Sequence, residues 1–198
     1  KGLEFPGYDV RGLKGTALAF AVSVRGACHL SAAVHNWDLA GKYWKFSGID
    51  RFDSGWRGFQ VKSGEDLTTA YDIYGVCKFS RHMYFLEGFK DIQKAITGCE
   101  KMDSDIMLMG ERVYNLQKMF NVREGLDRKD DVLPHRITHE KIPKGASQGA
   151  ILEETELQQL LDQYYMARGW SKNSIPTRAK LASLDLLGVV EEDYGANI

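Results

Sequence analysis

Helix signals recur along the chain, whereas the period-two alternation typical of half-buried strands is nearly absent, and this contrast constrains the fold most. The clearest signal is Asp103-Ser104-Asp105, because these side chains can accept hydrogen bonds from the free N–H groups at a helix start. Behind it, apolar residues recur at steps of three and four. This stripe consists of Ile106, Met109, Val113, Leu116 and Phe120. We therefore predict an all-α fold, an irregular multi-helix domain.

Further helices are expected on both sides of this one, each marked by an apolar period, a glycine stop or a capping residue. Their expected ranges are 12–24, 65–79, two short helices within 81–98 divided near Gly88, 153–169 with Gly169 as its cap, and a last helix opened by Ile175-Pro176-Thr177. The tail after Gly188 is polar. The stretch 127–149 reads as an extended connection, so its His135 and His139 are assigned to the surface rather than to a metal site.

The balance of charge excludes some classes of partner. The 198 residues carry 26 lysines and arginines against 27 acids, so no basic footprint for nucleic acid is present. No apolar run approaches the length of a membrane span. Three scattered cysteines argue against a disulfide scaffold and for a reducing compartment, so we expect a cytoplasmic protein.

An aromatic segment over residues 37–59 lacks a clear period. Its rings alternate with glycines at four positions between Gly41 and Gly58. Irregular segments of this length are often lids or partner contacts. A loop that packs its rings on the core is an equal alternative.

Two stretches combine reactive side chains with glycine. In the first, Cys28 and His29 follow Arg25-Gly26; in the second, Asp72 precedes Cys77 with Gly75 between them. Histidine titrates near neutral pH and can transfer protons, and a thiolate is a soft ligand for iron–sulfur clusters. Each residue also has a purely structural reading, His29 as a hydrogen-bonded core imidazole and both cysteines as inert core thiols.

An ordered set of motifs makes the pattern specific. The motifs are 1–12, Arg25–Leu30, Asp72–Cys77, Gly110–Leu116, Phe120–Gly125, Asp130–Pro134 and Tyr164–Trp170. Together, over residues 1 to about 187, they resemble the C-terminal third of the tungsten-containing aldehyde ferredoxin oxidoreductase family.

The resemblance implies a function and site residues. Asp72-Ile73-Tyr74-Gly75-Val76-Cys77 is similar to the family's Asp-x-x-Gly-Leu-Cys motif. By that match Asp72 binds a pterin, Gly75 lets the backbone approach, Val76 contacts the pterin through its backbone, and Cys77 is the fourth ligand of a [4Fe–4S] cluster. His29 matches a histidine beside the tungsten.

The implied enzyme oxidises aldehydes to carboxylic acids at a tungsten bis-pterin, with molybdenum as the other metal, and passes electrons to ferredoxin or an electron-transfer subunit. Residues 1–198 would form its C-terminal helical domain, and the N-terminal domains, with the other cluster cysteines, would lie in sequence upstream of Lys1. Val76 departs from the family's leucine, and the aromatic segment matches no family pattern. Two alternatives stay open: an aromatic acyl-CoA reductase of the benzoyl-CoA type, whose ring pocket the aromatic segment would shape, and a non-catalytic helical interaction module.

Overall fold

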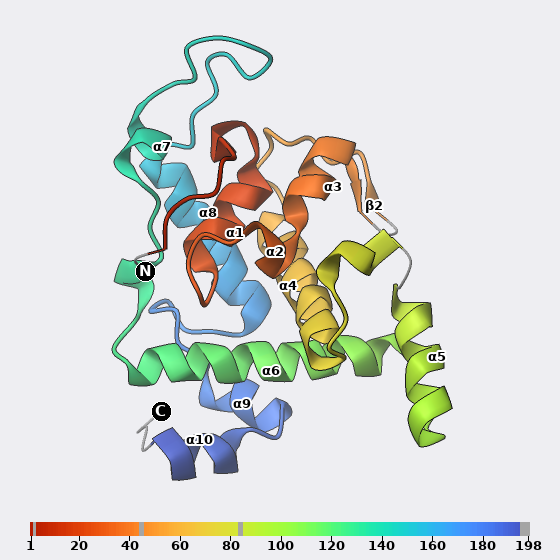
Figure 1. Ribbon diagram of the computed structural model, residues 1–198. Helices are drawn as coiled ribbons and strands as arrows, with labels where there is room; N and C mark the ends of the chain where they lie inside the picture. The colour runs from red at the N-terminus through yellow and green to blue at the C-terminus, as the bar shows by residue number, and fades with distance from the viewer. Residues whose placement is uncertain (2, 44–45, 83–84, 195–198) are drawn as a thin grey trace.

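The protein is all-α, as the sequence predicts (Figure 1). The structure, a computed structural model, describes residues 1, 3–43, 46–82 and 85–194. The helices are α1 (Lys14–Val22), α2 (His29–Ala32), α3 (Val34–Ala40), α4 (Arg57–Ile73), α5 (Leu86–Thr97), α6 (Asp103–Arg123), α7 (His135–His139), α8 (Glu154–Arg168), α9 (Arg178–Ser183) and α10 (Leu187–Tyr194). Short 3-10 turns are η1 (Val10–Gly12), η2 (Lys78–His82) and η3 (Arg128–Asp130). In the described ranges the strands are β1 (Lys42–Tyr43) and β2 (Phe46–Ser47), an antiparallel pair. No helix of these ranges is long and apolar enough to cross a membrane.

Helix α1 is buried along its whole length, because small and apolar side chains surround it. Its one charged residue, Lys14, is satisfied inside the protein: its Nζ lies 2.6 Å from a Glu156 carboxylate oxygen and 2.5 Å from the Ile151 carbonyl. The main core forms between α1 and α8, whose buried residues are Leu157, Leu160, Leu161, Tyr164, Tyr165 and Arg168. Gly169 ends α8 in the left-handed conformation, as predicted (φ 68°).

Helix α4 is packed by three other helices with their backbones in close contact. A Cβ atom added at Gly64 would overlap the Ala32 carbonyl oxygen of α2, and one added at Gly58 would lie 2.5 Å from the Gln163 backbone of α8. A Cβ atom at Gly110 of α6 would likewise overlap the Asp66 carbonyl oxygen of α4. Glycine is therefore required at each crossing, and these contacts hold α4 between α2, α6 and α8.

The buried face of α6 differs from the predicted stripe. Of the five stripe residues only Ile106 is buried, and Phe120 is 48% exposed. The buried face instead includes Gly110, Tyr114 and Lys118. The prediction was wrong because it counted apolar residues alone, whereas this face makes close backbone and polar contacts.

Other differences concern helix boundaries. Helix α4 begins earlier and ends earlier than the expected 65–79 range, and α5 runs without a break through Gly88. Met83, which was expected in a short helix there, lies outside the described residues. His135 and His139 occupy one helical turn, α7, with their rings stacked 3.9 Å apart. Helix α10 covers most of the tail that reads as polar, and Val190 of this helix is buried beneath α6.

Candidate functional site

The stretch from Asp72 to Cys77 forms the last turn of α4 and the turn that follows it. Gly75 has φ 67°, and its N–H donates to the Asp72 carbonyl at 3.1 Å. The Val76 N–H donates to the Tyr71 carbonyl at 2.9 Å. These two bonds form a Schellman motif, which needs a residue that tolerates positive φ. The helix stop therefore accounts for Gly75, and a Cβ atom there would meet nothing within 4 Å.

This turn displays its polar groups at the surface. Asp72, Gly75 and Cys77 are exposed, and the Cys77 thiol is free. The carboxylate of Asp72 forms an ion pair with Lys78, with 2.7 Å between Oδ2 and Nζ. A carboxylate, an open backbone and a thiol thus lie within six consecutive residues, and a ligand can approach all of them.

A pocket of about 390 Å³ lies beside this turn, between α4 and the C-terminal half of α6. Its lining residues are Val24, Arg25, Ser31, Thr69, Asp72, Lys78, Tyr114, Leu116, Gln117, Phe120 and Asn121. Two residues of the mispredicted α6 stripe, Leu116 and Phe120, therefore line this pocket. Arg25 and Lys78 add two positive charges to the one negative charge of Asp72, which favours an anionic group in the pocket. Sequence reasoning gave Arg25 and Lys78 no role.

His29 comes from a neighbouring element and does not line this pocket. It is the first residue of α2 and is half-buried. Its ring centroid lies 5.4 Å from that of Tyr8 and 5.7 Å from that of His35. Two residues further along α2, Ser31 lines the pocket with Asp72. The structure therefore places His29 near one side of the pocket and Cys77 in the turn after α4, without bringing the two side chains together.

The side chains of the turn fit the groups that the sequence predicts. An exposed free thiol has the donor chemistry of an iron–sulfur ligand, and a carboxylate next to an open backbone can accept hydrogen bonds from a pterin. In the described part of the chain, no three histidine, cysteine, aspartate or glutamate side chains form a metal-binding group.

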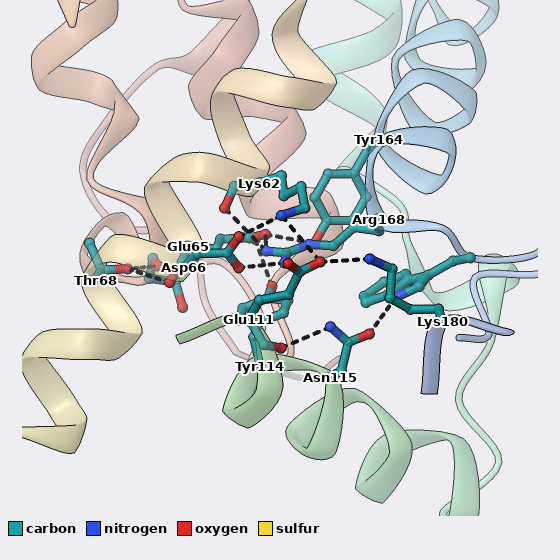
Figure 2. Close-up of polar contacts among 12 residues, drawn as sticks. Lys62, Glu65, Asp66, Thr68, Glu111, Tyr114, Asn115, Tyr164, Arg168 and Lys180 are labelled. Atoms are coloured by element: carbon teal, nitrogen blue, oxygen red, sulfur yellow. Dashed lines mark hydrogen bonds and ion pairs between the residues drawn. The ribbon is translucent and has the colours of Figure 1, made fainter. Parts of the chain in front are cut away.

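A buried network of charges lies one to two turns before Asp72 on α4 (Figure 2). The Glu65 carboxylate accepts hydrogen bonds from the Tyr114 hydroxyl, the Tyr164 hydroxyl and Arg168, each at 2.6 Å. Arg168 also binds Asp66 at 2.5 Å. The network joins α4 to α6 and α8 in the interior. A visible signal in the sequence is that Arg168 follows Tyr164 by four residues on the inward face of its helix, where an unpaired charge would be costly.

Burial controls the protonation of this network. It raises the pKa of Glu65, against the opposing effects of Arg168 and the two tyrosines. Burial, reinforced by the Glu65 charge, also raises the pKa of Tyr114 well above its ordinary value. Tyr114 consequently stays protonated and remains a hydrogen-bond donor. The tyrosines of the network are therefore neutral, and Arg168 supplies the positive charge that contacts Glu65 and Asp66.

The aromatic segment forms a second pocket, of about 580 Å³, at the other end of α4. Trp56, which is 78% exposed, and Phe59 form its aromatic wall, with ring centroids 5.8 Å apart. Arg57 fixes the loop beneath it through the Asp53 carbonyl, at 2.7 Å. Ser63, which also lines this pocket, precedes Asp72 by nine residues on α4, so at 1.5 Å per residue about 14 Å of helix separates the pocket from the Asp72 turn.

Comparison with known proteins identifies close relatives of this chain. Relatives described as tungsten-containing aldehyde ferredoxin oxidoreductase are 32% identical over 187 residues in Pyrococcus abyssi and 31% identical over 190 residues in Pyrococcus furiosus. Each match covers 94% of this chain, which spans about 30% of the length of either relative.

A solved structure shares the fold. It is described as the active site complex BamBC of benzoyl coenzyme A reductase in complex with 1,5 dienoyl-CoA, and it superposes with a TM-score of 0.58 at 20% identity, covering 79% of this chain and 23% of that one. The model of the family described as aldehyde ferredoxin oxidoreductase, domains 2 and 3, matches residues 1–186. The chain therefore belongs to the aldehyde ferredoxin oxidoreductase family.

Proposed function

We propose that the chain is the C-terminal helical part of a tungstopterin oxidoreductase that oxidises aldehydes to carboxylic acids. The observation that carries the proposal is the turn after α4, where an exposed carboxylate, an open backbone and a free thiol follow one another at the edge of a pocket. Family membership supports it, because the relatives are described as tungsten-containing enzymes of this kind.

The residues of the turn have distinct roles in this proposal. Asp72 holds a pterin through its carboxylate, and Lys78, already paired with it at 2.7 Å, orients that carboxylate. The N–H of Val76 is engaged by Tyr71, so the backbone contact expected of Val76 falls to its carbonyl oxygen. Cys77 supplies one thiolate to a [4Fe–4S] cluster. Arg25 faces the same pocket and can bind an anionic part of the cofactor.

His29 handles a proton of the reaction. Its half-buried imidazole is supported by Tyr8 and His35, which orient the ring without enclosing it. Neutral imidazole can accept a proton near physiological pH and return it to solvent. The metal centre, with tungsten or molybdenum, supplies the two-electron redox chemistry when bound, and the protein positions and insulates it.

The site as proposed is shared with other parts of a longer polypeptide. Residues 1–198 contribute one cluster ligand, one pterin carboxylate and a histidine, while the remaining ligands come from N-terminal domains of the same enzyme. A cluster held in part by Cys77 would supply the electron-transfer chemistry, with ferredoxin or an electron-transfer subunit in the cytoplasm as the proposed acceptor.

The alternative of an aromatic acyl-CoA reductase requires a ring pocket beside the metal. In the described part of the aromatic segment, the pocket lies about 14 Å along α4 from Asp72 and not beside it. The likeness to the benzoyl coenzyme A reductase structure, at 20% identity, concerns the fold alone. The relatives, described as aldehyde ferredoxin oxidoreductases, are what favours aldehyde oxidation.

The test uses the complete polypeptide with its cofactors. We expect tungsten and about four irons per chain, the content of one cubane cluster. Cys77→Ala should abolish the electron paramagnetic resonance signal of the reduced cluster. Cys99→Ala is the matched control, since Cys99 is also free and exposed, and it should leave the signal intact. A metal-free folded protein would instead indicate the interaction module, and a signal that survives in Cys77→Ala would refute the ligand assignment.

A further inference from the structure

The pocket beside Asp72 lies between two helices whose backbones meet at a glycine. Gly110 of α6 lies against the Asp66 carbonyl of α4, where no side chain fits between the backbones. The pocket is lined by Thr69 and Asp72 of α4 and by residues of α6 from Tyr114 onward. The width of the pocket therefore depends on the contacts that hold the two helices together at this crossing.

Tyr114 lies at that position, one turn after Gly110. Its side chain contributes to the wall of the pocket, while its hydroxyl donates to Glu65 Oε1 at 2.6 Å (Figure 2). Glu65 lies seven residues before Asp72 on α4, about 10 Å along the helix. One side chain of α6 thus touches the pocket and is bonded to the helix that carries Asp72.

The partners of Tyr114 are themselves fixed. Glu65 receives two further bonds from Tyr164 and Arg168, and the guanidinium of Arg168 lies 4.2 Å from the centroid of the Tyr114 ring. Tyr114 is 1% exposed, so its hydroxyl cannot exchange Glu65 for bulk water. We call the Tyr114 side chain with its hydrogen bond to Glu65 the tether. Its hydroxyl end is buried, and its other end faces the pocket.

We propose that Tyr114 is a positioning residue for the cofactor site: its bond to Glu65 sets the separation of α6 from the C-terminal turn of α4, and so the placement of Asp72 and Cys77. This inference rests on the proposed function for the identity of the site, and on the geometry alone for the tether.

The experiment compares two variants that each remove one hydroxyl from the same carboxylate. Tyr114→Phe keeps the pocket wall and loses the tether. Tyr164→Phe loses a 2.6 Å bond to the same carboxylate, together with the 3.1 Å bond that its hydroxyl accepts from Arg168 Nε, and is the control on the α8 side. In this chain, amide hydrogen exchange of residues 69–78 should accelerate roughly tenfold in Tyr114→Phe, the factor expected for one hydrogen bond to a charged group. In Tyr164→Phe the acceleration should be confined to α8.

Equal acceleration of residues 69–78 in both variants would show a general loss of stability and overturn the inference, as would no acceleration in Tyr114→Phe. If Tyr114→Phe does not fold, amide hydrogen exchange of the wild-type chain at low denaturant concentrations is the test. Amides 69–73 should then exchange through the same local unfolding event as amides 110–117. Exchange through separate unfolding events would overturn the inference.

A second measurement uses the complete polypeptide with its cofactors. Tyr114→Phe should alter the g values of the reduced cluster, and Tyr164→Phe should not. The exchange experiment needs no cofactor, so its outcome is independent of whether Cys77 binds the cluster. If Cys77→Ala keeps the cluster signal while the exchange result holds, the proposed function fails and the tether stands.

Discussion

At the scale of single residues, His29 illustrates how packing prepares a reactive group. Its ring lies against Tyr8 and His35 at the start of α2, and its burial is only partial. A core imidazole would be enclosed and hydrogen-bonded, whereas this one is oriented on one side and open on the other. Partial exposure of the imidazole is what the proposed proton transfer requires.

The corresponding prediction concerns the complete enzyme. His29→Asn should lower turnover by about 100-fold or more, the range of a lost general acid or base, while tungsten content stays unchanged because the residue is proposed to move a proton and not to hold the metal. Metal analysis and aldehyde oxidation rates measure the two effects. His139→Asn, an exposed histidine of α7, is the control and should leave both unchanged. Undiminished turnover in His29→Asn would assign the imidazole a packing role.

Residue-level expectations for the turn after α4 depended on local rules and could be made from sequence. A glycine can end a helix in a left-handed cap, and Gly75 has that conformation, although the expected helix ran on to residue 79. The partner of Asp72 could not be read in the same way, because whether Lys78 turns back to bind Asp72 depends on how η2 leaves the helix. The cofactor roles of Asp72, Val76, Cys77 and His29 stay predictions.

At the scale of elements, helix existence was predictable and helix orientation was less so. Capping residues and apolar periods located α6 and α8, since these signals act within a few residues. The inward face of α6 was mispredicted because Gly110 and Tyr114 face α4, and neither adds to an aliphatic stripe. Close approach of two backbones and a buried carboxylate elsewhere in the chain are tertiary facts that a single helix does not contain.

The close backbone contact at Gly110, compared with the open surroundings of Gly188, predicts opposite effects for alanine at these two helical glycines. Gly110→Ala would force its Cβ into the Asp66 carbonyl and push α6 from α4, so it should destabilise the chain by about 1–3 kcal/mol. Gly188→Ala in α10 meets nothing within 4 Å and should stabilise by up to about 1 kcal/mol through the higher helix propensity of alanine. Urea unfolding measures both. A neutral Gly110→Ala would mean that the crossing is not tight.

At the scale of the whole molecule, α6 lies between two layers whose residues are far apart in the sequence. Helix α4 with the turn after it lies on one side of α6, and α9 and α10 lie on the other (Figure 1). Glu111 of α6 connects them: its Oε1 lies 3.2 Å from Lys62 Nζ of α4 and 3.0 Å from Lys180 Nζ of α9. Nothing in the local sequence of 178–194 indicates this placement, because the contacts that fix it come from residues sixty or more positions earlier.

The Glu111 junction should make stability depend on pH in a defined direction. Burial alone would raise the pKa of Glu111, but Lys62 and Lys180 outweigh it and hold that pKa below its ordinary value of 4.5. The folded state therefore binds this proton less readily than the unfolded state, so the stabilisation is present above pH 4.5 and is lost as the pH falls through the folded pKa. Glu111→Gln should consequently be less stable than the wild type at pH 7 by about 1–2 kcal/mol, and the gap should close below pH 4.5. Urea unfolding at a series of pH values tests this, with Glu153→Gln, an exposed glutamate before α8, as the control that should show no gap. A difference that persists unchanged at low pH would show that the lost packing of the side chain, and not its charge, joins the two layers.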